Sequence, residues 1–114
     1  MSKYLISFPA EAMASLSAED LQRASDESRA VVREAKEAGV WVFGGGLDTS
    51  VEPVRVDETG GSTPGTYPQT EELDGGVTII EAPSREAALE WAAKIAAACR
   101  CAQEVRRFHD DPES

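Results

Sequence analysis

The stretch that decides the fold is YPQTEELDGGVTIIEAPSREAALEWA, residues 67–92. Its first residues predict the end of a loop. Gly76–Ala82 follows, where apolar and β-branched residues predict a strand. Ser84 follows Pro83 as a good N-cap, and the run of alanine, glutamate and leucine after it predicts a helix. The stretch therefore predicts a loop, a strand and a helix in direct succession.

Outward from this stretch, the chain predicts one more helix and four more strands. The helix begins after Ser17, whose hydroxyl suits an N-cap, and ends at Gly39. The run Gly44-Gly45-Gly46 lacks the spacing and the Lys-Ser/Thr of a phosphate loop, and predicts a bulge or a close backbone approach. Residues 59–68 predict a flexible loop. The further strands are predicted over residues 3–8, 40–43, 51–57 and 102–108.

The order of the elements predicts an α+β fold: a ferredoxin-like β-α-β-β-(β)-α-β antiparallel sheet with two helices on one face and an extra strand or hairpin arm. Alternation along the strands makes both sheet faces partly apolar. Tyr4 and Ile6 oppose Leu5 in the first strand, and Trp41 and Phe43 are expected to share one face of the second. Two helices cover only one face, so we expect a second copy on the other, forming a homodimer with a dimeric α/β barrel.

Length and charge limit the classes of function. The 114 residues suit one domain, predicted over 1–109, followed by an acidic tail over 110–114. The formal net charge of −10 argues against binding to nucleic acid or to anionic membranes. The apolar run at the start is too short for a signal peptide, and no stretch approaches the roughly 18 apolar residues of a spanning helix. The predicted location is therefore the cytoplasm.

No cofactor and no metal site is predicted. A bridge between Cys99 and Cys101 would be strained, and zinc would need ligands beyond these and His109, the only histidine. The cysteines are therefore interpreted as reduced thiols. His109 is the obvious general base by its ordinary pKa, but its place beside Asp110 in a polar tail predicts that it is dispensable.

Several segments carry a resemblance to a known family: the stretch 67–92, the helix end Ala38-Gly39, the strand Val54-Arg55-Val56 and the ending Glu104-Val105-Arg106. In this order and spacing the chain resembles the YCII-related family, in particular its DGPF branch. The resemblance implies a small α+β fold that dimerises and whose biochemical activity is mostly undefined.

The chain departs from the family pattern at two places. The signature Asp-Gly-Pro-Phe is replaced by Pro64-Gly65-Thr66-Tyr67, and the following Glu-x-Lys-Glu by Gln69-Thr70-Glu71-Glu72. Many members also have a histidine–aspartate pair thought to form an active site, but this chain has no histidine before His109. That pair cannot be transferred to this sequence.

Polar residues from three segments are the candidates for a ligand site near the sheet end. Glu104 and Arg106 share a face of the last strand; they could bind a polar molecule or form an ion pair at the sheet end or dimer seam. Arg55 could bind an anion or pair with Glu71 or Glu72, and the long loop could form a site or a dimer arm. The candidate ligand-binding residues are Arg55, Tyr67, Glu72, Glu104 and Arg106.

The function predicted from these observations is a homodimer that binds a small polar metabolite in a pocket near the dimer interface, without a recognisable catalytic set. The alternative is a cofactor-independent isomerase or lyase that acts on a small organic acid. The alternative rests on analogy with enzymes of the same barrel architecture.

Overall fold

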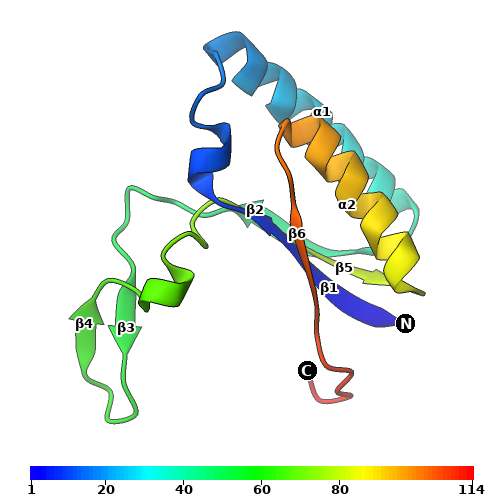
Figure 1. Ribbon diagram of the computed structural model, residues 1–114. Coiled ribbons are helices and arrows are strands. Elements are labelled where there is room, and N and C mark those ends of the chain that lie inside the picture. Colours follow the sequence, from blue (N-terminus) through cyan, green and yellow to red (C-terminus); the bar gives the residue numbers. More distant parts are fainter.

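A computed structural model describes the whole chain, residues 1–114, and shows an antiparallel sheet with two helices on one face (Figure 1). The sheet has four strands in the order β2-β5-β1-β6, with every neighbouring pair antiparallel. The predicted α+β, ferredoxin-like fold is confirmed. The elements of this layer are β1 (Ser2–Phe8), the 3-10 turn η1 (Ala10–Met13), α1 (Ala18–Glu37), β2 (Trp41–Gly46), β5 (Gly76–Ala82), α2 (Arg85–Cys99) and β6 (Glu104–Arg107).

Both helices begin at the N-caps that the sequence predicts. Ser17 Oγ accepts a hydrogen bond of 3.1 Å from the backbone N–H of Asp20, and Ser84 Oγ accepts one of 3.1 Å from that of Ala87. These bonds satisfy amide groups that have no partner inside the first helical turn. Gly39, just beyond α1, has a φ of 74°, a left-handed conformation that glycine adopts without strain.

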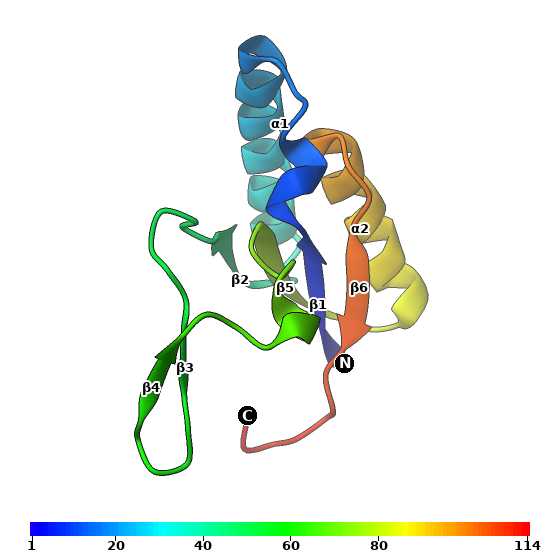
Figure 2. The ribbon, with the colours of Figure 1, turned by 60° about the vertical axis from the view of Figure 1, so that its left-hand side comes forward.

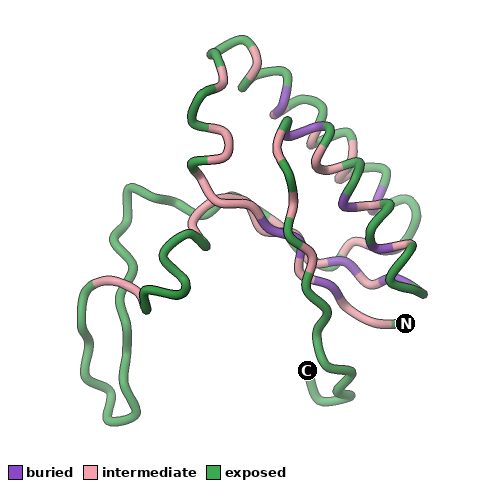
Figure 3. Tube along the Cα trace, viewed as in Figure 1, coloured by how far each residue is buried: buried purple, intermediate pink, exposed green.

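The hydrophobic core lies between α2 and the centre of the sheet, and it is small. Tyr4 and Ile6 of β1 and Ile80 of β5 pack with Ala88 and Ala92 of α2. Only 12 of the 114 residues are buried, mostly along β1, β5 and the inner sides of the helices (Figure 3). The radius of gyration is 15.4 Å, against roughly 13 Å for a compact domain of this length. A single chain therefore leaves much of its apolar surface exposed.

A bulge in β2 changes which of its side chains share a face. Trp41 pairs with Ile80 of β5, whereas Phe43 pairs with Ile79, so the register shifts between the two aromatic residues. Adjacent residues of β5 face opposite sides of the sheet, and Trp41 therefore lies on the helix-facing side with Ile80 while Phe43 does not. The prediction that Trp41 and Phe43 share a face is wrong, because the bulge at Val42 interrupts the alternation.

Three glycines occupy the helix-facing side of β2 and β5. The pairing register places Gly44, Gly46 and Gly76 on this side. A Cβ atom at Gly44 would lie 2.6 Å from the Trp41 ring, and one at Gly76 would lie 2.2 Å from the Phe8 ring. Aromatic rings therefore occupy space that side chains at these two positions would need, and the close approach predicted for the glycine run is found at Gly44.

A hairpin arm extends from the sheet between β2 and β5. Its strands are β3 (Val54–Val56) and β4 (Ser62–Pro64), and the 3-10 turn η2 (Pro68–Thr70) leads back towards the sheet (Figures 1 and 2). Every residue of β3 and β4 is exposed. The strand predicted over 51–57 is thus shorter than expected, and the loop predicted over 59–68 contains β4. The sequence Ser-Thr-Pro has no apolar alternation by which a strand could be predicted.

We expect Gly44→Ala to destabilise the fold and to displace the Trp41 ring, because the added methyl group would overlap the indole. The free energy of unfolding should fall by about 1–3 kcal/mol, the usual range for overpacking. Gly45→Ala is the matched control, since a Cβ atom there meets nothing within 4 Å. Denaturant unfolding checks both variants, and equal stability would contradict the close approach at Gly44.

Candidate functional site

A cleft of about 610 Å³ lies between the two helices and the helix-facing side of β2 and β5. This volume is in the range of small-molecule sites. Its lining combines aromatic rings, which offer flat apolar surface, with hydroxyl groups, which can donate or accept hydrogen bonds. The aromatic and hydroxyl-bearing residues of the lining are Phe8, Trp41, Phe43, Trp91, Ser25, Ser28 and Thr78.

The cleft is open because the sheet has few side chains beneath α1. Gly44, Gly46 and Gly76 all line it and present only backbone on this side. α1 packs mainly along α2 and has little contact with the sheet. Helix α1 is therefore held above the β2 edge. The rings of Trp41 and Phe8 cover Gly44 and Gly76, whereas the space above Gly46 is open.

Helix α1 contributes two cations to the cleft. Ser25, Arg29, Val32 and Lys36 line it at spacings of four, three and four residues, which places them along one stripe of the helix. Neither Arg29 nor Lys36 forms an ion pair in the chain. Lys36 Nζ lies 6.0 Å from the centroid of the Trp41 ring, at the limit of a cation–π contact.

The charge of the cleft is opposite to that of the whole chain. The protein has a formal net charge of −10, yet none of the residues that line the cleft is an aspartate or a glutamate. Arg29 and Lys36 are the only charged side chains of the lining. The cleft is thus a positively charged region in an acidic protein, which favours a ligand with negative charge.

Cys99, at the end of α2, is the one further titratable group in the cleft lining. Burial raises the pKa of its thiol, and the neighbouring Cys101 raises it further. The thiolate is the nucleophilic form of cysteine, so a raised pKa makes Cys99 a weak nucleophile at neutral pH. Both cysteines are free, as the sequence predicts, and no group of three or more acidic, cysteine or histidine residues could hold a metal ion.

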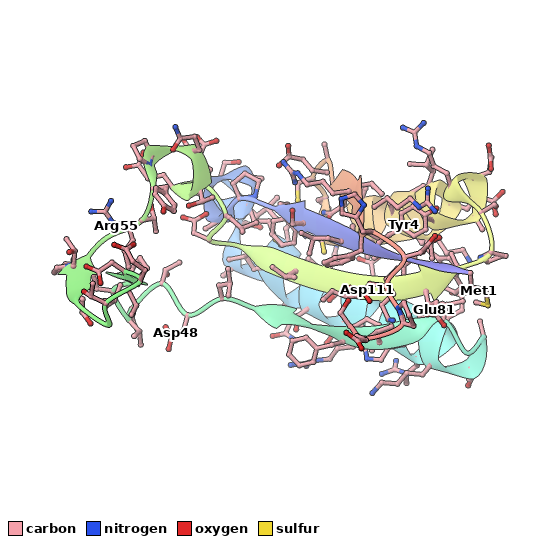
Figure 4. The ribbon with its side chains drawn as sticks, turned by 90° about the horizontal axis from the view of Figure 1, so that it is seen from below. Met1, Tyr4, Asp48, Arg55, Glu81 and Asp111 are labelled. Atoms are coloured by element: carbon pink, nitrogen blue, oxygen red, sulfur yellow. The ribbon has the colours of Figure 1, made fainter.

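Two of the five residues singled out from the sequence contact each other at the arm. Arg55 Cζ of β3 lies 5.9 Å from the centroid of the Tyr67 ring, a cation–π geometry. Figure 4 shows Arg55 at the end of the molecule that the arm forms, away from the four-stranded sheet. Arg55 forms no ion pair with Glu71 or Glu72 in the chain, and Glu72 is exposed.

The other pair, Glu104 and Arg106, lies on β6 as its spacing predicts. Arg106 Nη2 is 3.3 Å from Glu104 Oε2, and the two side chains are 57% and 63% exposed. Arg106 pairs with Leu5 of β1, so the ion pair is on the face of the sheet turned away from the helices. An ion pair this exposed contributes little to stability. The strand itself spans Glu104–Arg107, shorter than the predicted 102–108.

The predicted convergence of these segments on one pocket is therefore not found within a single chain. None of the five residues lines the cleft or the second large cavity of the structure. Their role in ligand binding stays a prediction, and their exposure leaves them available to a second copy of the chain. The five residues are Arg55, Tyr67, Glu72, Glu104 and Arg106.

Comparison with known proteins identifies the family. The model of the YCII-related domain matches residues 4–109. The chain belongs to the YCII-related domain family. No curated protein sequence gives a significant match.

The fold of this YCII-related chain is also found in a solved structure. It is similar to 5-chloro-2-hydroxyhydroquinone dehydrochlorinase (TftG) from Burkholderia phenoliruptrix AC1100, solved in complex with 2,5-dihydroxybenzoquinone. The identity is 16%, the alignment covers 97% of each chain, and the TM-score is 0.50. At this identity the similarity shows the fold.

The second cavity of the YCII-related chain, about 480 Å³, lies on the sheet face away from the helices. The C-terminal tail folds across this face, with Asp111 near Glu81 in Figure 4. The Phe108 amide donates a hydrogen bond of 3.0 Å to the Lys3 carbonyl, which anchors the start of the tail. His109 borders this cavity and is exposed.

Neither helix has the length and apolar character needed to span a membrane.

Sequence reasoning missed the two cations of the cleft. Ala24 and Ala35 belong to the buried apolar stripe of α1. Arg29 and Lys36 lie beside that stripe, and their sequence positions alone do not show a cavity next to them. Two features of the sequence could have indicated this site: the seven-residue spacing of the two cations on one helix, and the glycine-rich strand that follows that helix.

Proposed function

We propose that this YCII-related protein is a homodimer in which each subunit binds a small polar metabolite with a planar ring in the cleft beneath α1. The observation that carries the proposal is the composition of the lining: Phe8, Trp41 and Trp91 offer aromatic surface beside hydroxyl groups and cations. An apolar pocket with a few convergent polar groups is the usual form of a small-molecule site. Flat rings suit flat ligands, because stacked aromatic systems attract one another.

The proposed dimer is supported by the exposed apolar surface. Phe43 is 64% exposed, and Val54 and Val56 of the arm are 54% and 67% exposed. Leu5 and Ile79 add apolar area on the face that the helices do not cover. Exposed apolar residues on the sheet and on the arm of a small protein with a small core favour burial against a second copy.

We further propose that the residues singled out from the sequence act at this interface. Glu104 and Arg106 lie on the uncovered sheet face, and Arg55 and Tyr67 lie on the exposed arm. Phe43 borders the cleft and belongs to the exposed apolar surface, so an interface there would bring the pocket close to the partner.

The second candidate is a cofactor-independent isomerase or lyase that acts on a small organic acid. The name of the solved relative, a dehydrochlorinase of a hydroxylated ring, favours this class only by analogy of fold. The cleft lining contains no carboxylate and no histidine to act as a general base, and Cys99 has a raised pKa. The binding role is therefore favoured over the catalytic one.

The homodimer is expected to appear in light scattering at micromolar concentration as twice the mass of the chain. Phe43→Glu should shift the protein towards the monomer, because it places a charge in the proposed apolar interface. Leu89→Glu is the matched control: Leu89 is a 43% exposed apolar residue on α2, outside that interface. A stable, folded monomer of the unmodified chain would contradict the dimer.

Ligand binding is expected to change tryptophan fluorescence, because both tryptophans, Trp41 and Trp91, line the cleft. The probe is 2,5-dihydroxybenzoquinone, the planar ring bound by the solved relative, and saturable quenching should be observed. Gly46→Leu should abolish saturation by filling the cleft. Gly45→Leu should preserve saturation, because the backbone of Gly45 lines the cleft but a side chain there would point to the other face. A Cβ atom at either glycine meets nothing within 4 Å.

Quenching that only rises linearly with probe concentration, as for free tryptophan, would contradict the binding site. Equal loss in the Gly45 and Gly46 variants would place the binding elsewhere. Turnover of the probe, seen as a change in its absorbance with time, would instead support the enzymatic alternative.

A further inference from the structure

We propose that the cleft selects planar organic anions, and that Arg29 and Lys36 bind their ionised oxygen atoms. The inference rests on the proposed ligand-binding role of the cleft and adds the charge class of the ligand. A carboxylate or a phenolate on an unsaturated ring fits this description. Both present oxygen acceptors in the plane of the ring.

The first support is that Arg29 has no acidic partner. The chain has 21 acidic residues and eleven lysine and arginine residues. Six of the eleven form ion pairs, and Arg29 is not among them. Asp26, the acidic residue one turn before Arg29 on α1, instead accepts a hydrogen bond of 3.1 Å from Gln22 Nε2. The planar guanidinium of Arg29 therefore keeps its donors for a ligand, and its fork geometry matches a carboxylate.

The second support is the position of Lys36. It lies in the last turn of α1, where a cation also interacts favourably with the helix dipole, but that interaction uses none of its three hydrogen-bond donors. Its Nζ lies 6.0 Å from the Trp41 ring centroid, beside the aromatic surface of the cleft. A ring stacked near Trp41 would thus bring its ionised substituent within reach of Lys36.

The third support is the spacing of the two cations along the cleft. Seven residues separate Arg29 from Lys36, which corresponds to a rise of about 10.5 Å along α1. Both side chains are long enough to lean over the same cavity. A ring with one ionised group can be held by either cation, and a ring with ionised groups at opposite ends can be held by both. Because nothing in the lining is negative, no internal carboxylate competes with such a ligand.

The test compares three probes of similar size at neutral pH: benzoate, benzamide and protonated benzylamine. Binding is measured by tryptophan fluorescence of the full chain. Benzoate should bind about tenfold more tightly than benzamide, the gain expected for hydrogen bonds to a charged group. Benzylammonium should bind most weakly, although the net charge of −10 would attract it in the absence of a local positive site.

Variants assign the effect to the two residues. Arg29→Met and Lys36→Met should each weaken benzoate binding several-fold and benzamide binding much less, because the neutral amide accepts hydrogen bonds but has no charge to pair. Met retains an apolar side chain of similar length. Arg33→Met is the matched control, because it removes the same charge from an exposed position of α1 outside the cleft lining. Thermal unfolding of each variant shows that the fold is intact. Added salt should weaken benzoate binding and not benzamide binding.

The outcomes separate this inference from the proposed function. Equal affinity for benzoate and benzamide would overturn the anion selectivity while the cleft remained a ring-binding site. An equal loss with Arg33→Met would overturn the assignment to Arg29 and Lys36, because it would reflect overall charge. Failure of all three probes and of the quinone to bind would overturn both proposals. A phenol that releases a proton on binding would extend the inference from carboxylates to phenolates.

Discussion

The absence of side chains at Gly44, Gly46 and Gly76 is the constraint on which the site depends. These glycines lie on the helix-facing side of two adjacent strands, so this part of the sheet offers α1 mainly backbone, the rings of Phe8 and Trp41, and the side chains of Thr78 and Ile80. Close packing would require large side chains to fill the layer between helix and sheet. Their absence holds the cleft open, and the bulge in β2 turns Trp41 into it. The glycine-rich strand β2 therefore determines the shape of the cleft.

The distribution of charge gives this pocket its chemistry. Acidic residues dominate the chain, but they lie outside the cleft, whereas Arg29 and Lys36 line it without ion-pair partners. An anionic ligand would therefore be repelled by most of the surface and attracted at the cleft, where Arg29 and Lys36 are exposed to solvent. Besides the two cations, the lining has hydroxyl groups and one weakly nucleophilic thiol, and it contains no carboxylate or histidine.

The two faces of the sheet have different roles in this account. The helix-facing side carries the core and the cleft. The other side carries Leu5, Ile79 and the exposed Glu104–Arg106 ion pair, and we propose that a second copy covers it together with the arm. The C-terminal tail already crosses part of that face (Figure 4). A partner must therefore displace the tail or include it in the interface.

Local signals were sufficient to predict much of the fold. The caps Ser17 and Ser84 and the β-branched run Gly76–Ala82 mark their elements in the sequence, and the structure confirms all three. Features that depend on pairing could not be predicted. The bulge in β2 arises from its register with β5, and β4 forms only because Ser62–Pro64 meets β3.

The candidate site was harder to predict than the fold. Residues such as Arg55 and Arg106 were chosen because charged side chains are conspicuous beside apolar strands, yet they lie on the arm and on the far sheet face. The cleft forms where Gly44, Gly46 and Gly76 have no side chains and face one side of α1. In the sequence, Gly76 is far from that helix. Neither is visible until the strands are paired and the helix is placed over them.

Mapping of backbone amide chemical shifts during a benzoate titration tests the central claim most directly. The account predicts that the largest changes fall in the segments that line the cleft: residues 25–36 of α1, 41–46 of β2 and 76–78 of β5. The arm around Arg55 and Tyr67 and the Glu104–Arg106 pair should shift little. Large changes confined to the arm or to β6, with the cleft segments unchanged, would contradict the account and return the site to the residues first chosen from the sequence.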